Sequence, residues 1–414
     1  MAEPRPRLLV IMGSGETSPT MTKVHRELFS RLGPAASTAA LVLDTPFGFQ
    51  ENADDIGARA VEYFRESVNR EVKVASFRSA AEVGSVDHET MLARLSEADW
   101  VFSGPGSPSY AVAQWRQSRV PALLGDKLRH GGCVLFASAA AATLGPVTLP
   151  VYEIYKVGAD PHWLQGLDLL PIAGLAAAVV PHFNNAEGGN HDTRYCYMGE
   201  RRLRLLEEQL ADDAFVLGVD EHTALILDLG ARSATVAGLG AVTVRRHGAS
   251  ARVEAGQSMS IGCLANLAGQ ETAELPATQP APAAARSPLL DDVAGAEARF
   301  VAAVAGRDAR GAVEAILQLD DLIVDWSRDT LQSDELDRGR AALRSMIVRL
   351  GEAAEGGLRD ERDVIGPFVE ALLDARQQAR AGNRWADADG IRDRLLAAGV
   401  SVQDRPEGTS WQVG

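Results

Sequence analysis

The chain has little cysteine, few aromatic residues and no long apolar run. Its 414 residues include three cysteines, Cys133, Cys196 and Cys263, which lie far apart and form neither a disulfide framework nor a paired metal-binding motif. No apolar run approaches the roughly 20 residues of a membrane-spanning helix, and the block Leu8–Met12 is too short for a signal-peptide core. We therefore expect a reduced, cytoplasmic protein without a membrane partner.

Positive charge is also in short supply. The formal net charge is -15, from 41 Lys and Arg residues against 56 Asp and Glu residues. Such a surface repels a phosphate backbone at long range, which argues against bulk, sequence-independent binding of nucleic acid. A small, shape-specific RNA contact stays open.

A segment rich in proline and alanine divides the chain. Residues 274–288 (ELPATQPAPAAARSP) hold few large apolar side chains and cannot bury a core, which is typical of a semi-rigid linker. We predict an N-terminal domain over residues 1–269, a linker over 270–292 and a smaller C-terminal domain over 293–414.

The N-terminal domain alternates short apolar runs with helical patterns. This rhythm predicts an α/β fold with a mostly parallel, doubly wound sheet that finishes in antiparallel strands. In such a sheet the ligand cleft lies at the carboxyl ends of the strands. The expected strands are Leu8–Met12, Ala40–Leu43, Trp100–Phe102, Cys133–Phe136, Ala176–Val180, Phe215–Val219, Ala224–Leu227, Ala234–Ala237 and Val242–Arg245, and the expected helices are Asn52–Ser67, Val86–Ala98 and Val112–Arg129.

The C-terminal domain differs in kind. Its pattern is helical from Glu297 to about Leu396, and residues 399–404 and 408–411 then predict a short hairpin that closes on the helices.

Residues 131–145 (GGCVLFASAAAATLG) carry the most informative pattern. A short apolar strand, a run of very small residues around Ser138 and a helix start predict a nucleophile elbow. The glycines usual two places either side of the serine are replaced by Phe136 and Ala140. Because alanine tolerates a positive φ less well than glycine, a buried structural serine at a strand-to-helix junction is the alternative.

Two further strands end in residues that complete a hydrolytic site. His182 follows the strand Ala176–Val180 and is placed to act as a general base. Glu221, after the strand Phe215–Val219, could orient that histidine, with Asp220 as the rival carboxylate. The alternatives are a structural histidine and a surface turn.

Residues 184–197 (NNAEGGNHDTRYCY) form the densest polar segment. We predict that this loop binds a polar, amino-acid-like substrate. Its ligand types also fit a metal site built on His182, but the spacing matches no standard motif, so we expect no metal and no cofactor. A loop fixed by its own hydrogen bonds is the alternative. The predicted substrate-binding residues are Asn185, Glu187, His191, Asp192 and Arg194.

Two glycine loops follow strands. Neither residues 13–16 (GSGE) nor residues 103–108 (SGPGSP) have the spacing or the lysine of a phosphate loop. We expect the second to form one wall of an oxyanion hole, through a backbone N–H of Gly104 or Gly106.

These segments, in this order, resemble the cyanophycinase and dipeptidase E family of serine peptidases. The resemblance covers about residues 8–265 and implies a class I glutamine amidotransferase-like fold. It also implies that Ser138 is the nucleophile, His182 the base and Glu221 its partner, with oxyanion donors from the Gly104 loop and Ala139. Relatives in that family hydrolyse peptide bonds next to Asp, or links in an Asp-Arg polymer. The family elbow reads Gly-x-Ser-Ala-Gly-Ala, which this chain lacks.

The C-terminal domain resembles the anticodon-binding region of cysteinyl-tRNA synthetase over about residues 297–413. The likeness is carried by Glu370–Arg380, Trp385–Leu395 and the hairpin segments, and it implies that Trp385, Arg392 and Asp404 face tRNA. The catalytic segments of a synthetase, His-Ile-Gly-His and Lys-Met-Ser-Lys-Ser, are absent, so we expect no aminoacylation.

The charge of that region bears on tRNA binding and leaves only a weak, shaped contact open. Residues 293–414 hold 16 arginines, no lysine and 22 acidic residues, which argues against strong electrostatic capture of tRNA. The alternative is a module for interaction or for homodimerisation.

Three functions follow from these patterns. The first is a serine hydrolase that cleaves an amide or ester in a small peptide or amino-acid conjugate. The second is a tRNA- or synthetase-associated binding protein with a degenerate hydrolase site. The third joins the two, with the C-terminal domain presenting an aminoacyl- or peptidyl-tRNA whose ester the N-terminal domain hydrolyses.

Overall fold

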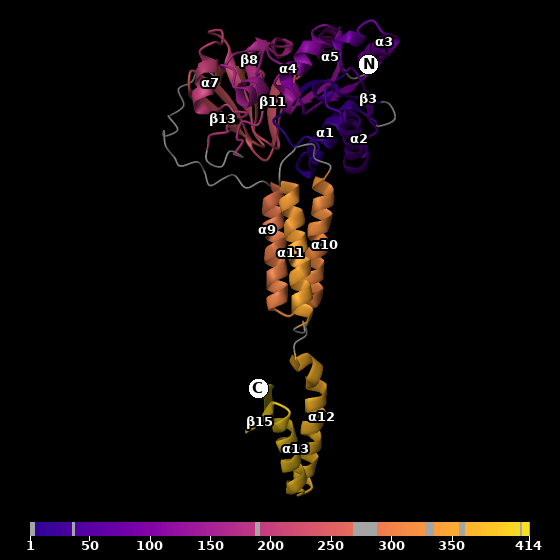
Figure 1. Cartoon of the computed structure of the whole chain (residues 1–414), viewed down its shortest axis with the longest axis vertical. Coiled ribbons are helices and arrows are strands. Elements are labelled where there is room, and N and C mark those ends of the chain that lie inside the picture. The colour runs from indigo at the N-terminus through magenta and orange to yellow at the C-terminus, as the bar shows by residue number, and fades with distance from the viewer. Residues whose placement is uncertain are drawn as a thin grey trace. The chain divides into compact units, whose positions relative to one another are not determined.

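The computed structural model describes residues 5–34, 38–186, 191–267, 288–327, 335–355, 361–405 and 408–413. The chain divides into two compact units (Figure 1). The first unit comprises Met1–Arg286 with Val324–Ser333, and the second comprises Ser287–Ile323 with Asp334–Gly414. In the described ranges, no helix combines the length and the apolar character needed to cross a membrane.

The first unit is built on an eight-stranded main sheet with the order β14-β11-β10-β1-β5-β4-β2-β3. Strands β1, β5, β4, β2 and β3 run parallel, and β10, β11 and β14 continue the sheet antiparallel. This mostly parallel sheet with an antiparallel end confirms the predicted α/β class. The strands are β1 (Arg7–Met12), β2 (Ala40–Leu43), β3 (Lys73–Ala75), β4 (Trp100–Ser103), β5 (Gly132–Ala137), β10 (Thr223–Asp228), β11 (Ser233–Gly238) and β14 (Ser258–Ser260).

Three strands that the sequence assigned to the same sheet form a second one, together with β13, which the sequence did not predict. Its order is β13-β12-β9-β8, made of β8 (Ala177–Val180), β9 (Phe215–Val219), β12 (Ala241–Arg246) and β13 (Ala249–Glu254). The short turn of residues 220–222 carries the chain from β9 into β10, and so from the second sheet into the main sheet. A separate two-stranded ribbon pairs β6 (Val147–Thr148) with β7 (Leu164–Gln165).

Helices cover both faces of the main sheet. Successive residues of β1 enter opposite cores: Leu9 and Ile11 pack with residues of α3, α4 and α5, whereas Leu8 and Val10 pack with residues of α1 and α2. The expected helix over residues 112–129 is two helices, because a new helix, α5, begins at Val120 with Pro121 in its first turn. The helices are α1 (Thr22–Leu32), α2 (Ala53–Tyr63), α3 (Val86–Glu97), α4 (Pro108–Trp115), α5 (Val120–His130), α6 (Ser138–Ala141), α7 (Gly199–Glu207) and α8 (Ile261–Leu267).

The second unit opens with α9 (Pro288–Ala305), with α10 (Ala309–Trp326) as far as Ile323, and with α11 (Glu335–Glu355). They meet at Gly339, where an added Cβ would lie 3.5 Å from Ile323 of α10 and 3.6 Å from Val293 of α9. Residues 288–292, which we assigned to the linker, already belong to α9, because proline fits the first turn of a helix. The rest of the predicted linker lies outside the described residues.

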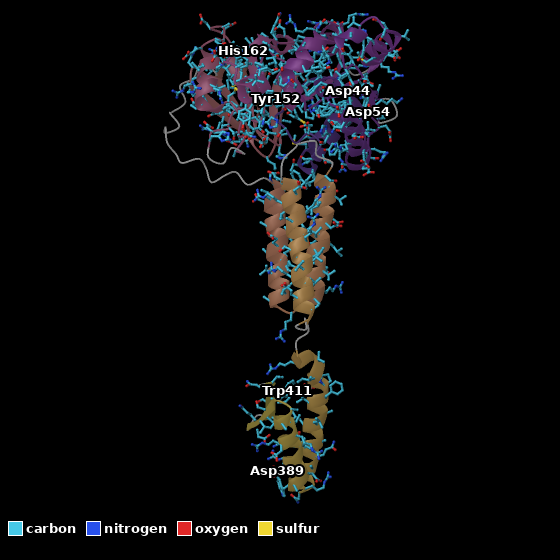
Figure 2. All side chains as sticks on the ribbon, in the orientation of Figure 1. Asp44, Asp54, Tyr152, His162, Asp389 and Trp411 are labelled. Carbon is cyan, nitrogen blue, oxygen red and sulfur yellow. The ribbon has the colours of Figure 1, made fainter. Side chains whose placement is uncertain are left out.

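The remainder of the second unit is helical and ends in a hairpin, as the sequence predicts. Helices α12 (Glu361–Ala381) and α13 (Trp385–Ala397) precede the antiparallel pair β15 (Val400–Arg405) and β16 (Gly408–Val413). Val369, Leu395 and Val400 form the small core that joins helices and hairpin. Trp411 of β16 packs at the edge of this core (Figure 2).

Candidate active site

The elbow at Ser138 is built without flanking glycines. Strand β5 ends at Ala137 in an extended conformation, and α6 begins at Ser138, whose φ is 49°. Neither Phe136 nor Ala140 is among the described residues with positive φ. The left-handed backbone that a sharp strand-to-helix turn requires therefore falls on the serine itself, and alanine suffices at its neighbours.

Phe136 does not crowd the turn, because its ring belongs to the core. It is fully buried and stacks on Trp115 of α4 with 5.3 Å between ring centroids. Trp115 is in turn fixed by a 2.9 Å hydrogen bond from Nε1 to Thr45 Oγ1. The bulky residue two places before the serine thus has a packing role.

Three side chains that follow three different strands form one hydrogen-bonded chain. Ser138 Oγ lies 2.8 Å from His182 Nε2, and His182 Nδ1 lies 2.9 Å from Glu221 Oε1. Ser138 follows β5 of the main sheet, whereas His182 and Glu221 follow β8 and β9, which are parallel neighbours in the second sheet. The site therefore lies where the two sheets meet.

Two asparagines hold Glu221 from behind. Asn184 Oδ1 accepts the backbone N–H of Glu221 at 2.8 Å, and Asn185 Nδ2 lies 3.5 Å from Glu221 Oε1. Burial opposes ionisation of Glu221, but the hydrogen bond and charge of His182 outweigh it, so the pKa of Glu221 is lowered. Asn185, which we predicted to bind substrate, is fully buried against this carboxylate.

Asp220, the rival carboxylate, has other partners. Its Oδ2 accepts the backbone N–H of Ala241 at 3.0 Å and lies 3.5 Å from Arg252 Nη2. Burial raises the pKa of this carboxyl group. Of the two candidate carboxylates, Glu221 is therefore the one that is hydrogen-bonded to His182.

The glycine loop of residues 13–16 packs against the turn that carries Glu221. Gly13 N donates to Thr223 O at 3.0 Å, and the backbone N–H of His222 donates to Ser14 O at 3.2 Å. A Cβ added at Gly15 would lie 2.2 Å from His222 Nδ1. Close backbone approach explains the glycines of this loop.

The second glycine loop reaches the elbow through Gly104. The carbonyl of Gly104 accepts the N–H of Ala140 at 3.1 Å, which sets this loop beside Ser138 and Ala139. Gly106 has φ 134°, and a Cβ there would lie 2.0 Å from Pro46 O. Of the three predicted oxyanion residues, Gly104 and Ala139 adjoin the serine, whereas Gly106 packs against the loop of Pro46.

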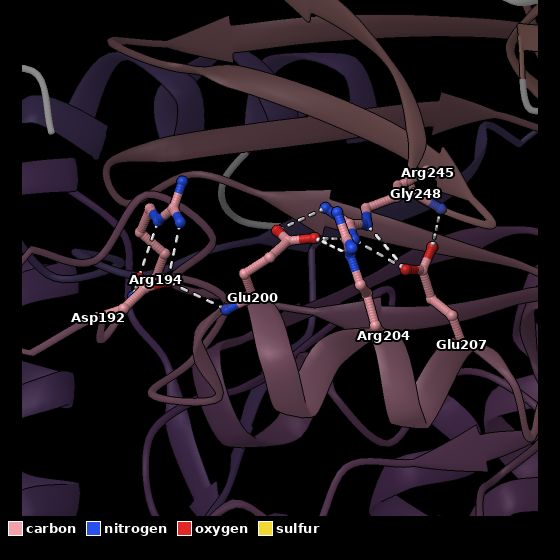
Figure 3. Close-up of polar contacts among 7 residues, drawn as sticks. All are labelled: Asp192, Arg194, Glu200, Arg204, Glu207, Arg245 and Gly248. Carbon is pink, nitrogen blue, oxygen red and sulfur yellow. Dashed lines mark hydrogen bonds and ion pairs between the residues drawn. The ribbon is translucent and has the colours of Figure 1, made fainter. Parts of the chain in front are cut away.

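The predicted substrate loop satisfies much of its own polarity. Arg194 makes two 2.8 Å hydrogen bonds to Asp192, and Asp192 also accepts the N–H of Glu200 at 3.0 Å (Figure 3). The hydrogen bond from Arg194 is the main reason that the pKa of Asp192 falls to about 2. His191 is exposed, with Nε2 3.4 Å from Tyr155 Oη. Glu187 lies outside the described residues.

Sequence reasoning missed the residues that hold this loop in place. Tyr195, Cys196 and Tyr197 all have positive φ, and Arg245 of β12 binds Glu200 of α7. Residue type and spacing carry no signal for either feature, because the partners lie 45 residues apart and left-handed backbone is not expected of tyrosine or cysteine. Within the described ranges, no cluster of three or more His, Cys, Asp or Glu side chains is arranged to hold a metal ion.

The predicted tRNA-facing residues fall into two groups. Trp385 and Arg392 are exposed on α13, seven residues apart and so on one helix face. Asp404 is instead occupied: Arg376 binds both of its oxygens at 2.8 and 2.7 Å, and Arg380 adds a third bond at 2.8 Å. Its carboxylate therefore ties the hairpin to helix α12.

The C-terminal region has a recognised counterpart. Residues 363–411 match the family model for the cysteinyl-tRNA ligase anticodon binding domain. The curated relatives include the cysteine–tRNA ligase of Arthrobacter sp. (strain FB24), 40% identical over 89 residues, which span 20% of this chain and 18% of the ligase. The ligase of Desulfovibrio desulfuricans (strain ATCC 27774) is 52% identical over 94 residues, 19% of this chain and 20% of the ligase. The chain thus spans about a fifth of the length of these relatives.

A solved structure resembles the larger part of the chain. A peptidase from an acI-B1 actinobacterium superposes with a TM-score of 0.50 at 18% identity, covering 62% of this chain and 97% of the peptidase. At this identity the likeness concerns the fold, which is peptidase-like.

Proposed function

We propose that this protein is a serine hydrolase that cleaves an amide or ester bond in a small peptide or amino-acid conjugate. The observation that carries the proposal is the hydrogen-bonded chain from Ser138 through His182 to Glu221, at 2.8 and 2.9 Å. A serine hydroxyl becomes a nucleophile only when a base takes its proton and a third group orients that base. The positive φ of Ser138 and the peptidase-like fold add support.

The chemistry follows from the geometry. His182 Nε2 accepts the proton of Ser138 as Oγ attacks the carbonyl carbon of the substrate, and Glu221 stabilises the imidazolium. The backbone N–H groups of Gly104 and Ala139 are the proposed donors to the oxyanion. The tetrahedral intermediate collapses when His182 returns the proton to the leaving amine or alcohol. Water, activated by the same histidine, then releases the acyl group and restores the serine.

Covalent labelling tests the nucleophile without knowledge of the substrate. A fluorophosphonate probe should label the wild-type protein at Ser138, and Ser138→Ala should abolish labelling. The matched control is Ser103→Ala, at the end of β4, because Ser103 is also buried and its hydroxyl donates to Leu43 O. An unlabelled wild type that also fails to hydrolyse a panel of acidic dipeptides contradicts the proposal.

The family match favours a second function, tRNA binding by residues 363–411. We propose that the exposed face of Trp385 and Arg392 is the contact, with Trp385 stacking on a base. Retention of total tRNA on filters at low salt tests this, with Trp385→Ala expected to weaken it. No retention by the full chain excludes it.

Together the two functions describe a hydrolase for the ester of an aminoacyl- or peptidyl-tRNA. Protection of charged tRNA by excess protein would contradict that combination.

A further inference from the structure

Three consecutive residues with left-handed backbone lie beside the main chain of His182. Tyr195, Cys196 and Tyr197 have φ values of 61°, 56° and 66°. This backbone is costly for residues that carry a Cβ, and it persists only where surrounding contacts hold it. We call these three residues the left-handed turn.

The left-handed turn is bonded to the segment that carries the histidine. Cys196 N donates to His182 O at 3.2 Å, and Tyr195 N donates to Phe183 O at 3.0 Å. His182 is itself left-handed, with φ 48°. The turn therefore fixes the main chain of the residue whose ring makes both hydrogen bonds of the site.

The ring of Tyr195 is held from several sides. The guanidinium carbons of Arg194 and Arg245 lie 5.0 and 5.5 Å from its centroid, and the Phe183 ring packs at 4.5 Å. These distances suit cation–π attraction, which strengthens away from water.

Arg245 is anchored on α7. It makes a bidentate pair with Glu200 at 3.0 and 2.7 Å and binds Glu207 at 3.0 and 2.9 Å (Figure 3). Arg245 and Glu207 are nearly inaccessible to solvent. Burial of Glu200 opposes its ionisation, but Arg245, with a smaller contribution from Arg204, outweighs this effect and the pKa of Glu200 falls to about 2. The guanidinium is thus locked in orientation above Tyr195.

We propose that Tyr195 and Arg245 are positioning residues, which clamp the left-handed turn and through it aim the ring of His182 at Ser138. This inference rests on the proposed hydrolase function. An Arg at position 245 serves because its planar fork binds two carboxylates and faces a ring at once, which a lysine cannot do.

Two variants and a matched control test the clamp in the full chain. Arg245→Lys keeps the buried positive charge but loses the fork, and Tyr195→Leu keeps the apolar bulk but loses the ring. The control is Arg204→Lys, because Arg204 binds the same Glu200 at 2.7 Å from an exposed position. The rate constant for fluorophosphonate labelling of Ser138 is measured under conditions where each protein is folded by circular dichroism.

We expect labelling to slow roughly 10- to 100-fold in both test variants, since small misplacements of a reacting group have effects of this size, and to stay unchanged in the control. A purely structural role would lower the urea midpoint and leave the rate constant of the folded protein as it is. Equal rate constants in all four proteins overturn the clamp.

A second readout separates this inference from the proposed function. Long-range ¹H–¹⁵N correlation of the histidine rings reports which nitrogen of His182 carries the proton. Both test variants should change this signal, and Arg204→Lys should not. A wild type that resists labelling overturns the hydrolase, whereas His182 signals unchanged by Arg245→Lys overturn the clamp, whatever the labelling shows.

Discussion

His182 Nδ1 and Glu221 Oε1 are 2.9 Å apart although 39 residues separate them in the sequence. The pair forms because β8 and β9 are parallel neighbours, with Val180 opposite Gly218, so the residues after both strands emerge at one edge. The carboxylate of the adjacent Asp220 accepts the backbone N–H of Ala241 instead.

Replacing Glu221 by glutamine should therefore disable the site. The amide keeps the shape of the carboxylate, but it carries no charge that could stabilise the imidazolium, and its NH2 group donates where a carboxylate oxygen accepts. We therefore expect kcat to fall by about 10³- to 10⁴-fold, with little change in KM. The control Asp220→Asn should retain kcat while it lowers stability. Steady-state kinetics on an ester that the wild-type protein hydrolyses measure kcat for both variants. Equal kcat values for Glu221→Gln and wild type contradict this prediction.

Restoring the family's glycine at position 136 should harm the protein. Phe136→Gly removes a fully buried ring that stacks on Trp115, and the cavity should cost at least about 3–5 kcal/mol in free energy of unfolding. Ala140→Gly, the other restored glycine, should cost only about 1 kcal/mol, because its φ needs no glycine. Urea unfolding followed by near-ultraviolet circular dichroism distinguishes them. A more reactive Phe136→Gly protein would show that the missing glycine limits the elbow.

Acid should destabilise the first unit through His25. This histidine is fully buried, its Nε2 donates to Glu16 O, and desolvation lowers its pKa from 6.5 to about 4. The unfolded chain then binds more protons between these values, so the stabilisation is complete above pH 6.5 and falls by on the order of 3 kcal/mol as the pH drops to 4. His25→Gln keeps a donor and should flatten this part of the stability–pH curve. Parallel curves for the two proteins would contradict the assignment.

In the second unit, we expect Asp404 to stabilise the fold and not to contact tRNA directly. The hydrogen bond from the buried Arg376 is the main reason that its pKa is lowered. Asp404→Asn leaves that guanidinium uncompensated, and because the carboxylate is 40% exposed we expect a loss of about 1–3 kcal/mol. Asp387→Asn, in a pair with both side chains 62% exposed, should cost close to nothing. If Asp404→Asn weakens tRNA retention without loss of thermal stability, Asp404 contacts the RNA directly.

The sequence predicted the α/β class because the strands are short apolar runs with distinct ends, such as Ala40–Leu43, which matches β2 residue for residue. It did not predict the second sheet, because pairing depends on contacts across the fold that an apolar run does not specify. Near the elbow, the pattern suggested that glycines were needed. In the structure a positive φ at Ser138 alone makes the turn, a property of the backbone that residue types do not reveal.

The candidate site divides in a similar way. Ser138, His182 and Glu221 could be proposed because each follows a strand, and their catalytic role stays a prediction. Arg194 was assigned to substrate from its type alone, although its partner Asp192 stands two residues away. Arg245 could not be found at all, since nothing in its strand marks it as the partner of α7.

The division of the site between two sheets has a consequence for the newly made chain. Ser138 follows β5, which pairs with β1 in the main sheet, whereas His182 and Glu221 follow β8 and β9 of the second sheet. On a ribosome, some 80 further residues must be made before Glu221 exists. Under the proposed mechanism, a growing polypeptide would therefore carry Ser138 without its base and without Glu221 until the strands β8 and β9 had been made.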